Sequence, residues 1–351
     1  MASQRQSGGD NSRPVQVGRD LNLSRGVSPA EARQIALDVY RSHELEQRGV
    51  ARAIVDERVE AVSNSFLLEL YRRAPQASHA LADPGVQFSL FTAQRDQARR
   101  GEDSLETTLV DLLVDRCTAT TGSLAAIVMD EAIATAGKLT QSQFATLSVA
   151  WYLQRTLSPS ITTVESHAHW ISRNLMPFVP MLPAHNSSYE HLAYTGCATL
   201  SPVTQALGSR FSASYPGVYS GGVPLMNLAV EGLGLETFAG DRRLFVAAER
   251  NPGWLRVVME GPSLPAYIGE LGLSEDQEAQ LGRLAVANSI GPARVLDELR
   301  PLVPDIDELR KAFEETALMR VQPTTVGTAI AHANARRVTG EQAPLSVWIA
   351  D

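Results

Sequence analysis

The amino-acid sequence predicts a mainly α-helical protein, a helical body with minor β structure in its C-terminal half and a short β-arch or hairpin near its N-terminus. Three observations predict this class. Apolar residues recur every three or four positions over most of the chain, helix-start signals precede these stretches, and apolar–polar alternation is confined to a few short segments. With 351 residues, of which 44% are hydrophobic and 20% charged, the composition is that of a globular protein large enough for two domains.

We expect three regions: an N-terminal segment at 1–27 that is flexible or β-assembling, a helical domain at 28–158 and an α-rich mixed domain at 159–351. The first boundary rests on a change from polar, turn-prone sequence to Ser28, which can cap a helix that has Pro29 in its first turn. The second boundary lies at Ser158-Pro159, where loops rich in Pro, Gly and Ser replace regular helical hairpins.

Periodicity and capping residues place the individual elements. In the first half they predict one helix beginning at 28 and further helices over about 48–74, 103–120, 123–136, 141–156 and 160–176. Pro75 and Asp83-Pro84-Gly85 are interpreted as ends of the first helix pair. In the second half they predict helices starting at 201 and 274 and spanning 305–318 and 325–337, with strands at 243–247, 255–259 and 345–349.

Bulk properties exclude several classes of protein. The formal net charge of −8 argues against a protein that coats nucleic acid. The N-terminus has no apolar signal-peptide core, and the longest uncharged run is broken by Pro and Gly, so we expect no transmembrane segment. The two cysteines are too few for a disulfide framework, which favours the cytoplasm. Nucleotide loops, the nucleophile elbow and the kinase residue set are absent, so we expect no cofactor and do not favour an enzyme.

The richest polar cluster is a set of side chains that can bind a metal or transfer protons: His167, His169, His185, Glu190, His191 and Cys197. Two of these histidines lie two positions apart, which on a helix directs them to different faces. The spacing also matches no standard zinc pattern. We therefore favour a hydrogen-bonded structural junction between a loop and a helix, with an enzyme or metal-dependent site between His167 and Cys197 as the alternative.

A second candidate is the segment 324–334, in which Gly327 permits the close approach of another backbone. His332 and Asn334 can face a site from this helix. A tightly packed core helix is the favoured interpretation. We interpret the adjoining Arg336-Arg337 as solvated surface.

The N-terminal segment contains the strongest motif. In the core Val15-Gln16-Val17-Gly18 the valines can form a dry zipper between identical chains, and Gln16 can build an amide ladder. Gly18 permits a sharp arch into a second short strand. The residues expected to make this homotypic assembly are Val15, Gln16, Val17, Gly18, Leu21, Asn22 and Leu23.

This motif resembles the homotypic interaction motif (RHIM) of receptor-interacting protein kinases and related amyloid signalling motifs of fungal and bacterial immune proteins. The whole chain also resembles a family of functionally uncharacterised bacterial proteins. That second resemblance is carried by the start at 9–20, the block 186–197 and the end at 326–349. It implies an order of domains and no activity.

These observations favour a bacterial defence or stress-signalling protein that self-associates, or binds another RHIM-like protein, through residues 8–26. We expect a homo-oligomer whose helical body is the sensor or effector. A tail or hairpin docked on the body is the plain alternative for the N-terminus. The His/Cys cluster leaves an enzyme open, and the helical half at 29–157 leaves a membrane-perturbing effector open.

Overall fold

The computed structural model describes residues 29–228, 234–248, 250–258 and 269–349, with side chains described from residue 49 onward. The chain divides into two compact units, residues 1–56 and 57–351. The fold is mainly α-helical, with a few short antiparallel strands in the C-terminal half, which confirms the predicted class. The strands expected around Val15–Val17 and Leu21–Leu23 lie outside the described residues.

Helices make up the first half of the described chain. In order they are α1 (Pro29–Arg73), the 3-10 helix η1 (Pro75–Ala82), α2 (Pro84–Arg100), α3 (Asp103–Thr118), α4 (Leu124–Ala136) and α5 (Gln141–Arg155). The predictions for α3, α4 and α5 are confirmed. The Ser123 hydroxyl caps α4, and Thr140 forms a capping box with Gln143 at the start of α5.

Two predictions in this half are wrong. The helices expected at 28 and at about 48–74 form one continuous helix, α1, because a single internal glycine, Gly49, does not end a helix. Helix α2 was not expected, because Asp83-Pro84-Gly85 was interpreted as an end. The Asp83 carboxylate instead accepts hydrogen bonds from the Gly85 and Val86 amides at 2.8 and 3.1 Å, so the tripeptide starts a helix.

The second half mixes short helices and strands. Its elements are α6 (Val164–Asn174), η2 (Met176–Met181), α7 (Asn186–Tyr194), β1 (Ala198–Leu200), α8 (Leu207–Ser214), α9 (Pro216–Tyr219), β2 (Val223–Pro224), η3 (Leu225–Leu228), η5 (Leu235–Phe238), β3 (Phe245–Ala247), β4 (Trp254–Val257), α11 (Glu275–Ala285), α12 (Pro292–Leu299), α13 (Ile306–Glu315), η6 (Ala317–Arg320), β5 (Val321–Pro323), α14 (Thr325–Thr339) and η7 (Leu345–Val347). Strands β2, β4 and β3 form one antiparallel sheet in that order, and β1 pairs with β5 with Leu200 opposite Val321.

The predicted helices that correspond to α6, α11, α13 and α14 and the strands that correspond to β3 and β4 are confirmed. A helix starting at Ser201-Pro202 is wrong: the Ser201 amide donates to the Arg320 carbonyl at 2.8 Å, which continues the pairing of β1 with β5, and α8 begins only at Leu207. The strand expected at 345–349 is also wrong. Its hydrogen bonds are local, as from the Trp348 amide to the Leu345 carbonyl, and close a 3-10 turn.

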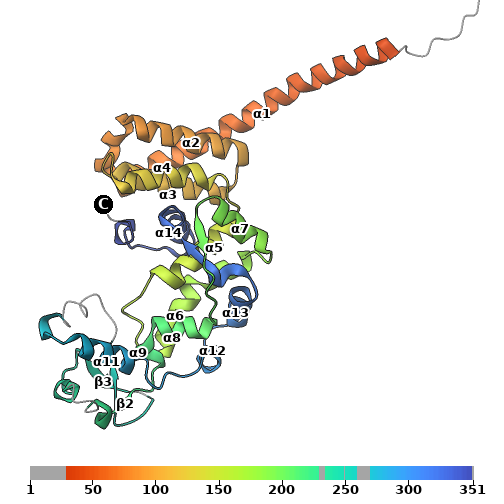
Figure 1. Ribbon diagram of the computed structural model, residues 1–351. Helices are drawn as coiled ribbons and strands as arrows, with labels where there is room; N and C mark the ends of the chain where they lie inside the picture. The colour runs from red at the N-terminus through yellow and green to blue at the C-terminus, as the bar shows by residue number, and fades with distance from the viewer. Residues whose placement is uncertain (1–28, 229–233, 249, 259–268, 350–351) are drawn as a thin grey trace, which may run out of the picture. The chain divides into compact units, whose positions relative to one another are not determined.

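Helix α14 organises the main hydrophobic core. It packs against α3, α4 and α5 (Figure 1). The core includes fully buried residues from before and after residue 158, such as Leu147 on α5 and Ile330 on α14. A smaller, second cluster surrounds the three-stranded sheet and α11, with Phe245 and Leu281 among its members. The domain boundary at 158 stays a prediction.

Candidate functional site

His167, the first residue of the predicted polar cluster, is buried among aromatic side chains. Its ring is fully buried on α6, and its Nδ1 shares a 2.6 Å hydrogen bond with the Tyr219 hydroxyl. The rings of Phe211 and Tyr215 lie 4.9 and 4.7 Å from it, centre to centre. Burial lowers the pKa of His167 to about 3, so the ring is neutral at physiological pH. The His167 side chain therefore acts as a packing residue of the core.

The other members of that cluster lie apart from His167. His169 is exposed on the same helix, and His185 is exposed at the start of α7. His191 Nδ1 is 3.0 Å from the Gln143 side-chain nitrogen, and burial raises the pKa of the Cys197 thiol. Among the described residues, no three His, Cys, Asp or Glu side chains lie close enough together to hold a metal ion. Glu190 is exposed.

The second predicted segment is a packed interface at the start of α14. A Cβ atom on Gly327 would lie 1.8 Å from the Cys197 carbonyl oxygen, so this glycine does permit the close approach of another backbone. The Asn334 amide donates to the Ser148 hydroxyl at 2.9 Å. His332 Nε2 bonds to the Ala343 carbonyl oxygen at 2.8 Å, and burial lowers the pKa of this ring. These side chains are directed into the core.

A groove of about 1100 Å³ lies at the last turn of α14. Its walls come from the end of α1, from α3, from the first turns of α4, from the end of α14 and from residues 342–349. It is large enough for an organic molecule. Seven charged side chains line it, four arginines and three carboxylates, which gives the lining a formal charge of +1: Glu69, Arg72, Arg73, Asp111, Asp115, Arg336 and Arg337.

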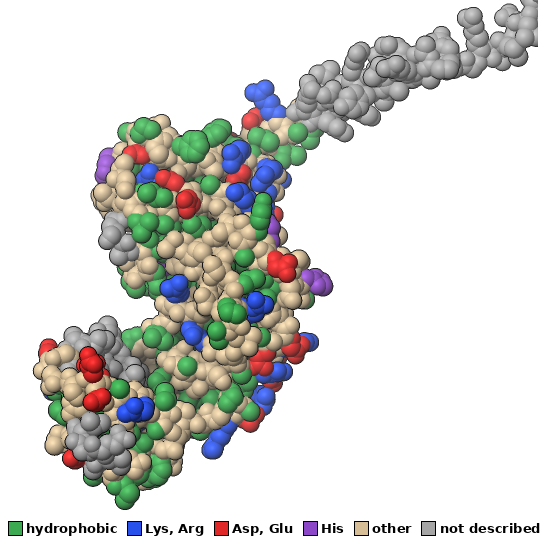
Figure 2. Space-filling model, viewed as in Figure 1, with side chains coloured by type: hydrophobic (Ala, Val, Ile, Leu, Met, Phe, Trp, Pro, Cys, Tyr) green, Lys and Arg blue, Asp and Glu red, His purple; other side chains and the backbone are tan. Residues whose placement is uncertain are grey.

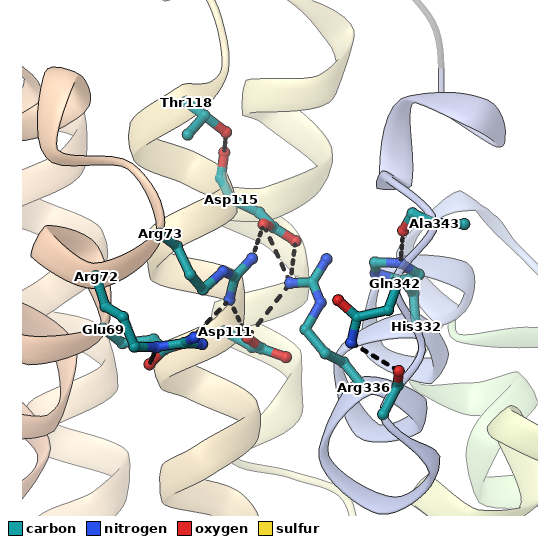
Figure 3. A network of polar contacts seen from close by, with 11 residues as sticks. Glu69, Arg72, Arg73, Asp111, Asp115, Thr118, His332, Arg336, Gln342 and Ala343 are labelled. Carbon is teal, nitrogen blue, oxygen red and sulfur yellow. Dashed lines mark hydrogen bonds and ion pairs between the residues drawn. The ribbon is translucent and has the colours of Figure 1, made fainter.

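An ion-pair network joins three helices at this groove (Figure 3). Asp111 and Asp115 lie one turn apart on α3 and share two guanidinium groups. Arg73 of α1 bonds to Asp111 and, at 2.8 Å, to Asp115. Arg336 of α14 reaches both carboxylates through its Nη1 atom at 3.3 Å. The network therefore ties the end of α14 to the helices of the first half.

The electrostatics of the network follow from partial burial. Burial raises the pKa of Asp111, while Arg336 and Arg73 oppose this shift. Burial lowers the pKa of Arg336, but Asp115 and Asp111 outweigh it and hold that pKa above its usual range. Also in the lining of the groove, Arg72 donates two hydrogen bonds of 2.9 and 2.5 Å to the Glu69 carboxylate and lowers the pKa of that carboxyl.

Sequence reasoning missed this network. The interpretation of Arg336-Arg337 as solvated surface is wrong for Arg336, whose side chain is only 19% exposed and ion-paired. One signal was present: Asp111 lies within the apolar stretch 109–114 and Asp115 follows it directly, and buried carboxylates need cationic partners. Their partner Arg336 lies more than 200 positions along the chain, so only the fold identifies it.

A protein-family model matches residues 26–349, nearly the whole described chain. The chain belongs to this uncharacterised bacterial family. The match confirms the broader of the two resemblances seen in the sequence, and it begins after residues 15–23, where the sequence predicts the assembly motif. No curated protein and no solved structure gave a significant match to the chain.

Proposed function

We propose that this chain is a bacterial, cytoplasmic defence or stress-signalling protein that assembles through residues 8–26, with its helical body as the sensor or effector. One observation carries the proposal: the motif Val15-Gln16-Val17-Gly18 directly precedes the region that the family model matches as a unit, residues 26–349. A short segment that pairs with its own kind, placed next to a folded body in the sequence, is typical of proteins that signal by assembling. The partner is a second copy of the chain or another RHIM-like protein.

The chemistry of the segment supports stacking between like chains. In-register strands would satisfy their backbone groups above and below and would repeat the Gln16 amide ladder along the stack. Three arginines oppose this by stacking like charges: Arg13, Arg19 and Arg25. Because salt screens such repulsion, assembly should strengthen as salt is raised.

The body supports a binding role better than acid–base chemistry. The histidines of the predicted cluster do not form a metal-binding group, and His167 is enclosed by aromatic rings. Among the described residues that line the groove there is no histidine or cysteine, whereas seven charged groups surround a space fit for a ligand. A sensor that binds a ligand in the groove fits this arrangement.

The experiment compares the full chain with a variant in which Val15-Gln16-Val17-Gly18 is replaced by four alanines. We expect the natural chain to form thioflavin-positive assemblies that increase with salt, and the variant to stay dispersed with an unchanged melting temperature. Bacteria expressing the two proteins should also differ in growth or phage survival. A natural chain that stays monomeric at high concentration and high salt, or a variant that assembles equally well, contradicts the proposal.

A second candidate function rests on exposed apolar side chains of the helical half. Phe88 and Phe91 on α2 are 70% and 58% exposed, and Leu124 and Ile127 on α4 are each 50% exposed. Each pair lies on one face of its helix, and hydrophobic side chains gather on the visible surface over α2 and α4 (Figure 2). This pattern favours a membrane-perturbing effector at 29–157 that acts at the lipid surface.

The test of this candidate is dye leakage from anionic vesicles by the full chain. None of the described helices is both long and apolar enough to cross a bilayer, so leakage should come from interfacial binding. Phe88→Ser/Phe91→Ser should reduce it strongly, whereas Thr107→Ser, on the exposed surface of α3, should not. Equal leakage by both variants, or none by the natural chain, removes this candidate.

A further inference from the structure

We propose that the groove at the end of α14 binds a small organic anion, a phosphate monoester or carboxylate attached to an apolar body. The anionic group would lie on Arg336 and Arg337, and the apolar body would lie against Leu68 and Leu345. This deepens the sensor role proposed above and names the class of ligand. Binding by the groove requires no assembly through residues 8–26, so the two proposals can fail separately.

The first argument is the balance of charge. All three carboxylates of the lining are already engaged by arginines: Glu69 by Arg72, and Asp111 and Asp115 by both Arg73 and Arg336. One positive charge remains in the lining. A cationic ligand would have to displace guanidinium groups from these carboxylates, whereas an anion would compensate the remaining charge.

The second argument is the set of unused donors. Arg336 engages Asp111 and Asp115 through Nη1 alone, and in Figure 3 its other nitrogens carry no dashed line. Arg337 bonds only to the Asn334 side-chain oxygen, at 2.8 and 3.3 Å, and no described carboxylate forms an ion pair with it. Burial lowers the pKa of Arg337. A guanidinium with free donors is suited to bind phosphate or carboxylate.

The third argument is the apolar part of the wall. Leu68 on α1 is 73% exposed beside the charged network, so its side chain is accessible to the apolar part of a ligand. Met129 of α4 and Leu345 of η7 also line the groove. The groove of about 1100 Å³ thus has both apolar and charged surface. A ligand with an apolar body and an anionic group fits it better than a bare inorganic ion does.

The experiment is calorimetric titration of the full-length four-alanine variant, which keeps the body and removes the motif. Hexyl phosphate, hexanoate, hexanol and inorganic phosphate are the probes. We expect hexyl phosphate or hexanoate to bind at least about tenfold more tightly than both hexanol and inorganic phosphate, because only they use both surfaces. The comparison of hexyl phosphate with hexanoate distinguishes phosphate from carboxylate ligands.

Variants assign the two surfaces. Arg337→Gln, which breaks no ion pair among the described residues, should weaken hexyl phosphate about tenfold, and Arg336→Gln should do the same. Leu68→Ala should weaken hexyl phosphate and leave inorganic phosphate unchanged. Arg300→Gln is the matched control, since its carboxylate partners Asp297 and Asp307 lie outside the groove.

Three results would overturn the inference. Binding of hexyl phosphate and hexanoate that is no tighter than binding of hexanol would show adsorption to apolar surface only. Affinity unchanged in both Arg337→Gln and Arg336→Gln would remove the anion site. Absence of binding by every probe would remove the groove as a site for this class of ligand. Each holds whether or not the natural chain forms fibres.

Discussion

The middle and the last turn of α14 place polar side chains in opposite situations. In the middle, His332 and Asn334 bond to a carbonyl and a hydroxyl of the surrounding core at 2.8 and 2.9 Å. In the last turn, Arg336 and Arg337 line a groove and keep unused donors. The contrast teaches that a polar side chain closed in by its partners contributes to folding, whereas one beside an open space can also bind.

The largest expected effect tests the closed part of α14. Gly327→Ala would place a methyl group 1.8 Å from the Cys197 carbonyl oxygen, and backbone atoms cannot yield cheaply. We expect a loss of more than about 3 kcal/mol in the free energy of unfolding, measured by denaturant melts. The control, Gly282→Ala on α11, meets nothing within 4 Å and should be neutral or stabilising by up to about 1 kcal/mol. Equal effects would show that α14 is not closely packed there.

The next effect tests the ion-pair network that joins the last turn of α14 to α1 and α3. Asp111→Asn keeps the shape of a side chain that is 11% exposed but removes its charge from Arg73 and Arg336. We expect a loss of about 2–3 kcal/mol, because both guanidinium groups are left under-compensated. Asp297→Asn, at a position 65% exposed, is the control and should leave the melting temperature unchanged. An unchanged free energy of unfolding in Asp111→Asn would mean that the network contributes no stability.

The effect that is smallest near neutral pH is a pH dependence of stability that comes from the buried ring of His167. Its folded-state pKa of about 3 lies below the ordinary 6.5, so the unfolded chain takes up the proton first as pH falls. Stability should therefore be complete above pH 6.5 and should fall as the pH drops from 6.5 towards 3, because protonation favours the unfolded chain over this range. His167→Phe should flatten this slope, while His185→Gln, at an exposed position, should keep it. An unchanged slope in His167→Phe would contradict the burial of the ring.

Local sequence predicted most helices because their signals are local. Ser123, Thr140 and Ser274 each cap the helix that follows them, and no distant contact is needed to recognise this. Local signals gave wrong predictions where a strand pairing with a distant segment, or the residues that follow, determine the structure. Ser201 extends the pairing of β1 with β5 through its hydrogen bond to Arg320, and Asp83 caps α2 where the end of a helix pair was expected.

The candidate site was harder to predict for the same reason. Histidine and cysteine drew attention to residues 167–197 because of their chemistry, but the fold separates them. Asp111, Asp115 and Arg336 form a site only because α14 packs beside α3. The two aspartates signal locally that a cationic partner exists, but no local pattern identifies Arg336 as that partner.

One measurement tests the contrast between open and closed polar sites most directly: the melting temperature and the affinity for hexyl phosphate, determined together for Arg337→Gln and His167→Phe. We predict opposite results for the two variants. Arg337→Gln should lose about tenfold in affinity at an unchanged melting temperature, and His167→Phe should melt earlier at neutral pH with unchanged affinity. If His167→Phe lost affinity while Arg337→Gln kept it, the account would be contradicted.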